Sequence, residues 1–279
     1  MKATYGAMFQ PAMKPIILLL LVLFAACSQK QPLAHKSAAV ESAERLERRA
    51  TAAFVKGDLL SAAKDYQVAA SVYESLAMQD ELAVTQLNLA RIENESGRKP
   101  HAQSLVEEVL RKASTGAPYR PATLLIANGR AAAFAIGAEN WPAAAAYLDT
   151  AQAMCQSGCD AVSALLVLRS EWMLATNDTA GAQVVANQAF ERATNPSDKA
   201  NALRAKAQVA MKMNAYQSAI TEASAALQID QEQGASSRVI ADLALLSQAH
   251  SEAGNASQAA QYKALEQKAQ KARDWLHAK

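Results

Sequence analysis

The sequence predicts an all-α protein built from helical hairpins that stack on one another. Apolar residues make up 51% of the 279 residues, yet aromatic residues supply only 5%. The apolar material is largely alanine, which has the highest helix propensity and lets helix axes approach closely. Long alternations of Val, Ile or Thr with polar residues do not occur, which argues against a β-sheet.

The clearest copy of the hairpin spans residues 197–234. Leu203, Ala207 and Met211 recur at helical spacing, the pattern breaks at Asn214, and a second apolar stripe begins at Tyr216. One hairpin cannot bury both stripes. Neighbours stacked on either side must cover them, which is the logic of a helical solenoid.

Residues 1–26 have the pattern of a secretory signal peptide. Lys14 precedes an apolar run over residues 16–26, and small residues lead to Cys27. The 11 residues of the run are too few to span a membrane, which takes about 20. A start at Met13 would give a compact signal of normal order, so the choice between Met1 and Met13 stays open.

Residues 24–28 resemble a bacterial lipobox, although Phe24 departs from the usual leucine. The resemblance implies that Cys27 becomes the acylated first residue of the mature protein, with palmitate among its lipids. Ser28 after the cysteine, rather than aspartate, resembles lipoproteins that are passed to the outer membrane. Several acyl chains anchor firmly, because each buried methylene adds about 0.8 kcal/mol. A plain cleaved signal and a cytoplasmic chain are the alternatives.

We therefore expect a protein that is lipid-anchored to the periplasmic face of the outer membrane. Residues 27–40 are polar and aperiodic, and they are expected to form a flexible tether. The formal net charge of +2 comes from Lys2 and Lys14, both in the segment expected to be removed. The mature chain is then near neutral, which gives no electrostatic reason to expect nucleic acid as a partner.

Six copies of the hairpin align on a small residue near the start of each second helix, here called the register residue. Successive register residues lie 40, 42, 38, 37 and 40 positions apart. In the last copy, Lys263 and Glu266 replace apolar residues, as expected for a terminal helix that faces water. The register residues are Ala62, Ala102, Ala144, Ala182, Ala219 and Ala259.

Two further positions follow the same register. A turn residue or polar breaker lies five residues before each register residue, and a small residue lies twelve before it. The breakers are Gly57, Gly97, Glu139, Asn177, Asn214 and Gly254. The small residues are Ala50, Ala90, Ala132, Ser170, Ala207 and Ser247.

This order of residues resembles the tetratricopeptide repeat. Residues 216–219, Tyr-Gln-Ser-Ala, nearly match the family's Tyr-x-x-Ala, and residues 57–62 and 140–144 are close to its turn and second helix. The period near 40 exceeds the family's roughly 34 residues, so each hairpin needs longer helices. The resemblance implies a right-handed superhelical α-solenoid of about six hairpins over residues 41–277. An irregular alanine-rich bundle is the alternative.

Cys155 and Cys159 predict a disulfide. An even number of cysteines outside the lipobox suits an oxidising periplasm. A spacing of four residues brings the Cα atoms within bridging reach, and Gly158 lets the chain turn. Free thiols, or a redox or metal site, are the alternatives, but the spacing and the strand–helix setting of thioredoxin-like motifs are both missing.

The sequence carries no motif for catalysis or for a cofactor. His101, His250 and His277 lie far apart, without a second ligand at metal-binding spacing. Phosphate-binding loops, nucleophile elbows and zinc helix motifs do not occur. We therefore expect neither an enzyme, nor a cofactor, nor a metal site.

The resemblance also implies a groove along the inner face of the first helices, where the family holds peptides or partner helices. The groove candidates share one helical face within each copy. A clamp for a terminal carboxylate is not expected, since Glu47 and Thr51 stand where the clamp set begins and only Asn88 and Arg130 resemble its later members. The candidates are Leu87, Asn88, Arg91, Asn94, Glu171, Arg204, Gln208 and Met211.

These features predict a scaffold or assembly adaptor that binds other envelope proteins or peptides through its concave groove. A constitutive structural subunit that uses its ends and convex face is the second reading, and a periplasmic hydrolase is the third. Nothing in the residue pattern identifies the partner.

Overall fold

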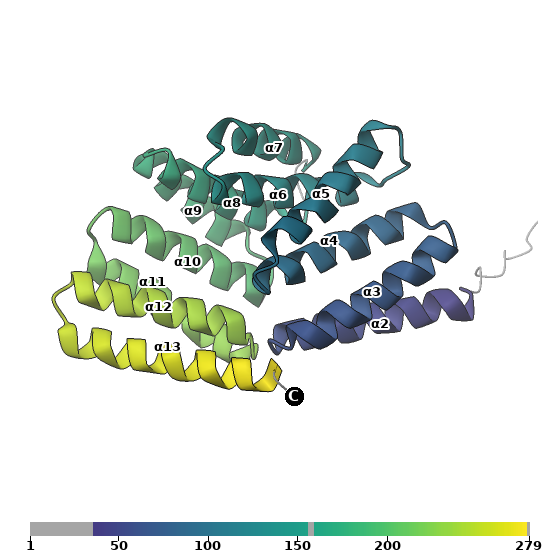
Figure 1. Ribbon diagram of the computed structural model, residues 1–279. Helices are drawn as coiled ribbons and strands as arrows, with labels where there is room; N and C mark the ends of the chain where they lie inside the picture. The colour runs from purple at the N-terminus through teal and green to yellow at the C-terminus, as the bar shows by residue number, and fades with distance from the viewer. Residues whose placement is uncertain (1–35, 156–158, 278–279) are drawn as a thin grey trace, which may run out of the picture. The chain divides into compact units, whose positions relative to one another are not determined.

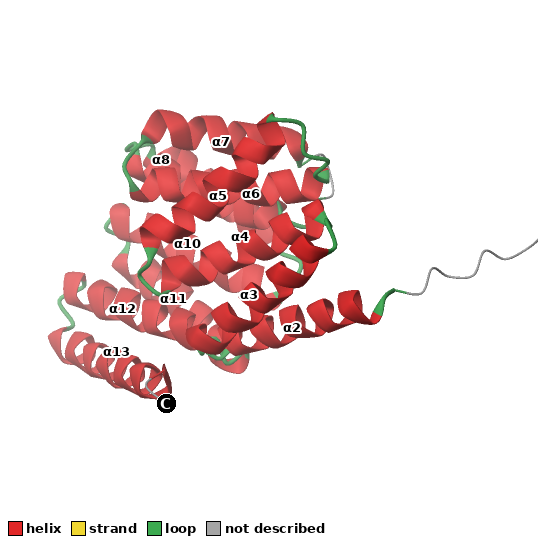
Figure 2. Ribbon diagram, turned by 45° about the vertical axis from the view of Figure 1, so that its right-hand side comes forward, coloured by secondary structure: helices red, strands yellow, loops and turns green. Residues whose placement is uncertain are grey.

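The computed structural model describes residues 36–155 and 159–277, and this part of the chain forms twelve helices and no strand (Figures 1 and 2). The helices follow one another as six antiparallel hairpins, so the predicted fold class is confirmed. The hairpins are α2 (Ala38–Val55) with α3 (Leu59–Ser75), α4 (Gln79–Glu95) with α5 (Lys99–Ser114), α6 (Pro121–Gly137) with α7 (Trp141–Met154), α8 (Val162–Ala175) with α9 (Thr179–Arg192), α10 (Pro196–Lys212) with α11 (Tyr216–Glu232), and α12 (Ser236–Glu252) with α13 (Ala256–His277).

The amino-terminal predictions lie mostly outside the described residues. The signal peptide, Cys27 and residues 28–35 of the tether are not described. Helix α2 begins at Ala38, so the last three residues assigned to the tether are helical instead. Within the described residues, no helix is long and apolar enough to cross a membrane.

The six predicted breakers all adopt a left-handed backbone, with φ between 57° and 83°. Each ends the first helix of its hairpin. In the first hairpin the Gly57 N–H donates to the Phe54 carbonyl, and the Asp58 N–H donates to the Ala53 carbonyl, both at 2.9 Å. This paired arrangement satisfies carbonyls at the helix end. Glycine adopts the left-handed conformation freely, whereas the Cβ atom of Glu139 makes this conformation sterically unfavourable.

The register residues occupy core positions in the first five hairpins. The first five have no exposed surface, while Ala259 in the terminal hairpin is partly exposed. The small residues twelve positions earlier are also fully buried in the first five copies. Proline in the first turn of α5, α6, α7 and α10 costs no hydrogen bond, because the first amides of a helix have no partner within it.

The first helices form the inner layer of the stack. Helix α4 contacts α6, α6 contacts α8, and α8 contacts α10. The turn after α2 also reaches the start of α12, where the Ser236 hydroxyl donates to the Lys56 carbonyl at 3.2 Å across 180 residues. A Cβ atom added at Gly57 would lie 2.1 Å from the Ser236 hydroxyl oxygen. Glycine at position 57 therefore favours the turn and leaves room for this contact.

Candidate binding groove

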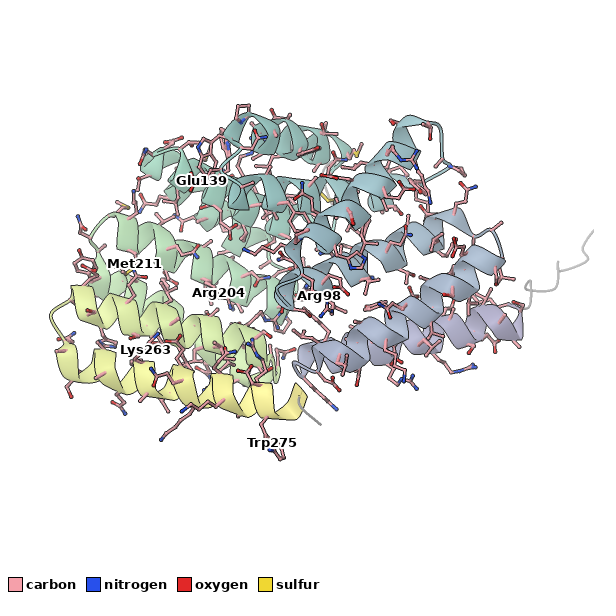
Figure 3. The ribbon with its side chains drawn as sticks, viewed as in Figure 1. Arg98, Glu139, Arg204, Met211, Lys263 and Trp275 are labelled. Atoms are coloured by element: carbon pink, nitrogen blue, oxygen red, sulfur yellow. A yellow bond between two sulfur atoms is a disulfide. The ribbon has the colours of Figure 1, made fainter. Side chains whose placement is uncertain are left out.

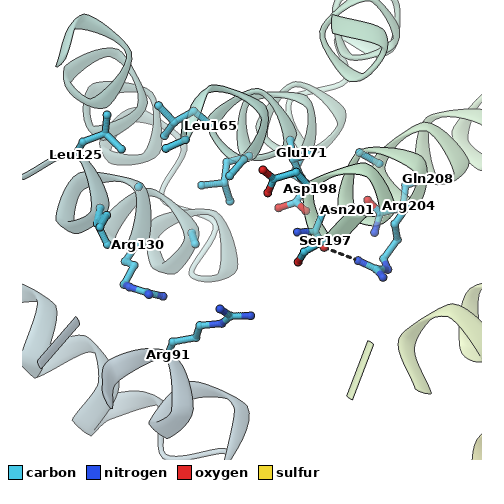
Figure 4. A pocket seen from close by; sticks show the side chains of 18 residues that line it. Arg91, Leu125, Arg130, Leu165, Glu171, Ser197, Asp198, Asn201, Arg204 and Gln208 are labelled. Atoms are coloured by element: carbon cyan, nitrogen blue, oxygen red, sulfur yellow. Dashed lines mark hydrogen bonds between the residues drawn. The ribbon is translucent and has the colours of Figure 1, made fainter. Parts of the chain in front are cut away.

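The inner faces of α4, α6, α8 and α10 surround a hollow of about 470 Å³, here called the inner pocket (Figure 4). This volume lies in the range of protein ligand sites. Leu125, Ile126 and Leu168 form apolar wall, whereas Arg91, Arg130 and Glu171 bring charge to it.

The lining follows the repeat register. In the third, fourth and fifth copies, the residues eleven, fourteen and eighteen positions before the register residue all line the inner pocket, and in the second copy the residue eleven before it does. Steps of three and four residues place these positions on one helical face. The first of these positions holds Arg91, Ala133, Glu171 and Gln208 in successive copies.

Arg130 enters the inner pocket from α6 without a carboxylate partner. Its Nη2 atom donates to Asn88 Oδ1 at 3.3 Å, and its Nε atom has no hydrogen-bond partner. Within the described residues, no salt bridge to its guanidinium occurs. Burial, followed by repulsion from Arg91, lowers the pKa of Arg130 to about 10, so the side chain stays charged at neutral pH.

Arg91 enters from α4 and is only weakly compensated. The Glu95 carboxylate lies 3.8 Å from its Nε atom, and the Phe54 ring centroid lies 4.2 Å from its guanidinium carbon. Although 45% of the side chain is exposed, burial lowers the pKa of Arg91. An open hollow explains both observations, because water reaches the guanidinium while the surrounding walls displace much of its hydration.

Glu171 lies on α8 and faces the other side of the inner pocket (Figure 4). Burial raises the pKa of Glu171, and the attraction of Arg204 only partly opposes this effect. Its side chain makes no hydrogen bond or salt bridge within the described part of the chain. The inner pocket thus holds opposite charges on separate helices.

Arg204 lines the same hollow, but its donors are already used by the fold. Its Nε atom lies 2.7 Å from Asp242, its Nη2 atom 2.5 Å from Asp230, and its Nη1 atom donates to Asn201 at 3.0 Å. Arg238 lies 2.7 Å from the other oxygen of Asp230. The network ties α10, α11 and α12 together, so Arg204 is a structural residue at the edge of the inner pocket.

Four of the eight groove candidates line the inner pocket: Arg91, Glu171, Arg204 and Gln208. Asn88 lies beside it as the acceptor for Arg130. The prediction that Leu87 faces the groove is wrong, because Leu87 has no exposed surface and packs in the core formed with α5 and α6.

Asn94 and Met211 do not line the inner pocket. Asn94 is exposed near the end of α4, and Met211 lies near the far end of α10 (Figure 3). Arg130, Leu125, Ile126 and Leu168 were not among the candidates. The signal for Arg130 and Leu168 was present, because both occupy the repeat position of Asn88 in later copies.

A disulfide joins Cys155 and Cys159, whose Cα atoms lie 5.3 Å apart. Both cysteines pack against a cluster that contains Leu125 and Leu165, and these two side chains also line the inner pocket. The bridge therefore supports the wall of the inner pocket from behind.

Of the remaining residues considered for chemistry, His250 and Trp172 contact neighbouring parts of the fold, whereas Trp275 is exposed. The described residues contain no group of three or more potential metal ligands. His250 stacks on Tyr262, and the Trp172 indole donates to the Trp141 carbonyl at 3.1 Å. Trp275 projects from α13 and is 58% exposed (Figure 3).

No protein-family model and no curated protein sequence matches the chain. Solved structures do match it in fold. One is BtubC from P. vanneervenii, with a TM-score of 0.53 and 15% identity over 86% of this chain and 93% of that chain. Another is the tetratricopeptide-repeat sensor STAND protein PH0952 from Pyrococcus horikoshii, with a TM-score of 0.56 and 15% identity over 82% of this chain and 35% of that chain.

The apo form of RapI matches with a TM-score of 0.54 and 13% identity, covering 80% of this chain and 64% of that chain. The chain thus spans less than two thirds of RapI and about a third of PH0952. Identities this low define the fold alone. The fold is that of a tetratricopeptide-like α-solenoid.

Proposed function

We propose that the protein is a lipid-anchored scaffold of the outer membrane, and that its inner pocket holds a segment of another envelope protein. The inner pocket carries this proposal, because it combines apolar wall with charges that the fold does not use. Surfaces of this kind suit an extended or helical segment with apolar anchors and matching charges. The lipobox-like residues around Cys27 support the location, and the solenoid class supports binding rather than catalysis.

A second candidate function is a constitutive subunit that assembles through its last helix. Leu265 and Trp275 on α13 are 42% and 58% exposed. Large apolar side chains at the end of a stack would suit permanent packing against a neighbour.

Chemical crosslinking and pull-down from the native envelope separate the two candidates. The charge reversal Glu171→Arg should remove the partner from the captured material, because it replaces an acidic side chain of the inner pocket with a further cation. Arg192→Glu on the outer helix α9 is the matched control and should leave capture unchanged. A partner that survives Glu171→Arg but is lost on Trp275→Ser would replace the scaffold proposal with the subunit.

A further inference from the structure

We propose that the inner pocket is a two-ended site that selects a peptide segment bearing an acidic and a basic side chain separated by apolar residues. Arg91 and Arg130 would hold the acidic group, and Glu171 would hold the basic group. This inference rests on the proposed function and specifies the chemistry of its ligand.

The two arginines proposed to hold the acidic group differ from Arg49, Arg98 and Arg120 in what they contact. Arg49, Arg98 and Arg120 each pair with a carboxylate that is nearly buried. Arg130 has no carboxylate, and Arg91 has one at 3.8 Å. Two cations that face one hollow repel each other, and the contact of Arg91 with Phe54 does not remove this repulsion. An anionic ligand would relieve this repulsion.

Nearby groups do not supply that anion. Arg238 repels Arg91, and its own contacts with Asp230 and the Ser197 hydroxyl are made at 2.7 Å each. Asn88 offers one neutral acceptor to Arg130. Glu95 is the single carboxylate close to Arg91, and burial raises its pKa. Arg91 and Arg130 therefore face the inner pocket with positive charge that nearby groups only partly neutralise (Figure 4).

Glu171 calls for a cation as its partner, whereas the two arginines call for an anion. Its carboxylate lies in the same hollow on α8, and the cation that acts on it, Arg204, is held by Asp230 and Asp242. A ligand cation at this end would be paired without disturbing the fold. Lysine or arginine side chains are the groups that a protein segment can offer.

The repeat geometry sets the spacing between the two ends. Arg91 and Glu171 occupy the same repeat position on α4 and α8, with Ala133 of α6 between them. Neighbouring helix axes lie about 8–10 Å apart, so the two backbones lie at most about 20 Å apart. The reach of both side chains shortens this span. An extended chain rises about 3.3 Å per residue, which places the acid and the base roughly four residues apart.

The apolar wall belongs to the same hollow as the charged ends. Leu125 and Ile126 of α6 and Leu168 of α8 line it. Side chains between the acid and the base of the ligand should therefore be apolar. A terminal carboxylate is not required, since Glu47 and Thr51 occupy the positions of the terminal clamp, and Glu47 accepts hydrogen bonds from Tyr73 and Thr85 at 3.1 and 2.6 Å.

The test uses the full-length protein purified from its envelope in detergent, labelled with ¹⁵N, and the blocked peptide Ac-Glu-Leu-Ala-Leu-Lys-NH₂ as the probe. Saturable shifts of the Arg91 and Arg130 Nε–H resonances are expected. Replacing the probe's Glu by Gln should weaken binding about tenfold, and so should replacing its Lys by Gln. A tenfold loss of affinity corresponds to roughly 1.4 kcal/mol of binding free energy. A peptide with a free carboxyl terminus in place of the Glu side chain, and inorganic phosphate, test the other sources of anion. If either matches the probe in affinity and in shifts, charge alone is recognised and the inference is overturned.

Variants assign each end of the site. Arg130→Gln should abolish the preference for Glu over Gln in the probe, while Glu171→Gln should abolish the preference for Lys and leave the first preference intact. Arg192→Gln should change neither. Because Arg130 makes few contacts with the fold, Arg130→Met should be no less stable to unfolding than the wild type. This result would show that the charge can be removed without loss of folding.

The outcomes for the ligand chemistry and for the scaffold role differ. If the uncharged peptide binds as tightly as the probe, the two-ended site is wrong while the groove remains. If the probe binds as expected but Glu171→Arg leaves envelope capture unchanged, the site stands and the proposed function falls. If the probe shifts neither arginine resonance, the two-ended site is wrong.

Discussion

The Ser170 hydroxyl donates a hydrogen bond to the carbonyl oxygen of Ala182 at 3.0 Å, and Ser247 makes the same bond to Ala259 at 3.0 Å. In both hairpins the serine lies twelve residues before the register residue. The register read along the chain is therefore a physical contact between the two helices of a hairpin. Where alanine replaces the serine, apolar packing makes the same contact.

Overpacking this contact should destabilise the array locally. We expect Ala219→Leu to cost about 1–3 kcal/mol, because Ala219 has no exposed surface. Hydrogen exchange should show the greatest loss of protection in α10 and α11 and in the adjacent hairpins. Ser257→Leu, at an exposed site on α13, is the control and should cost little. Equal and uniform losses in both variants would show that the register is misplaced.

Substitutions at Gly97 and Gly137 distinguish the effect of backbone strain from the effect of packing. An added Cβ would meet nothing within 4 Å at Gly97 or at Gly137, but only Gly97 has a left-handed backbone, with φ of 81°. Gly97→Ala should therefore destabilise by about 1–2 kcal/mol, whereas Gly137→Ala at the end of α6 should stabilise by up to about 1 kcal/mol. Urea unfolding measures both, and the same sign for the two variants would contradict the assignment of the turn.

Asp80 joins the second hairpin to the third and should make stability depend on pH. Its carboxylate accepts from the Arg120 backbone N–H and the Thr123 hydroxyl at 2.7 Å each. Burial alone would raise the pKa of Asp80, but these hydrogen bonds and the Arg120 guanidinium lower it overall. The stabilisation is then present above about pH 4, the ordinary value, and is lost as pH falls through the lowered pKa.

The variant Asp80→Asn tests this linkage. At pH 7 it should be less stable than the wild type by about 2 kcal/mol. The gap in the free energy of unfolding should narrow as the pH is lowered below about 4. A gap that is constant down to acidic pH would show that the charge of Asp80 is not what holds the hairpins together.

The disulfide should be visible in the protein isolated without reducing agent. Non-reducing mass analysis is expected to find Cys155 linked to Cys159, and Cys155→Ser should lower stability by at most about 2 kcal/mol. Alkylation of both thiols without prior reduction would rule the bridge out.

Under the proposed function, anchoring depends on Cys27, which precedes the described residues. Cys27→Ala should abolish acylation and leave uncleaved or mislocalised precursor. Membrane fractionation after metabolic labelling with palmitate provides the measurement. A variant that still fractionates with outer membranes would remove the lipoprotein assignment.

Local patterns allowed the hairpins, their turns and their closest contacts to be predicted, because each depends on residues fewer than twenty positions apart. The groove was only partly predictable. Leu87 and Asn88 are neighbours on α4, and whether one faces the core or the groove depends on how the next hairpin packs. Arg204 could not be recognised as structural, since its partners Asp230 and Asp242 come from two later helices. The contact of Ser236 with Lys56 depends on the summed geometry of the intervening hairpins.

Site-specific photocrosslinking in the native envelope tests the central claim most directly. A photoreactive amino acid at Ala133, in the inner pocket, should link to one envelope protein, and the linked peptide should carry an acid and a base about four residues apart. The same group at Val184, which is 56% exposed on α9, should not produce this adduct. An adduct formed from Val184 and not from Ala133 would contradict the proposal that the inner pocket is the binding site.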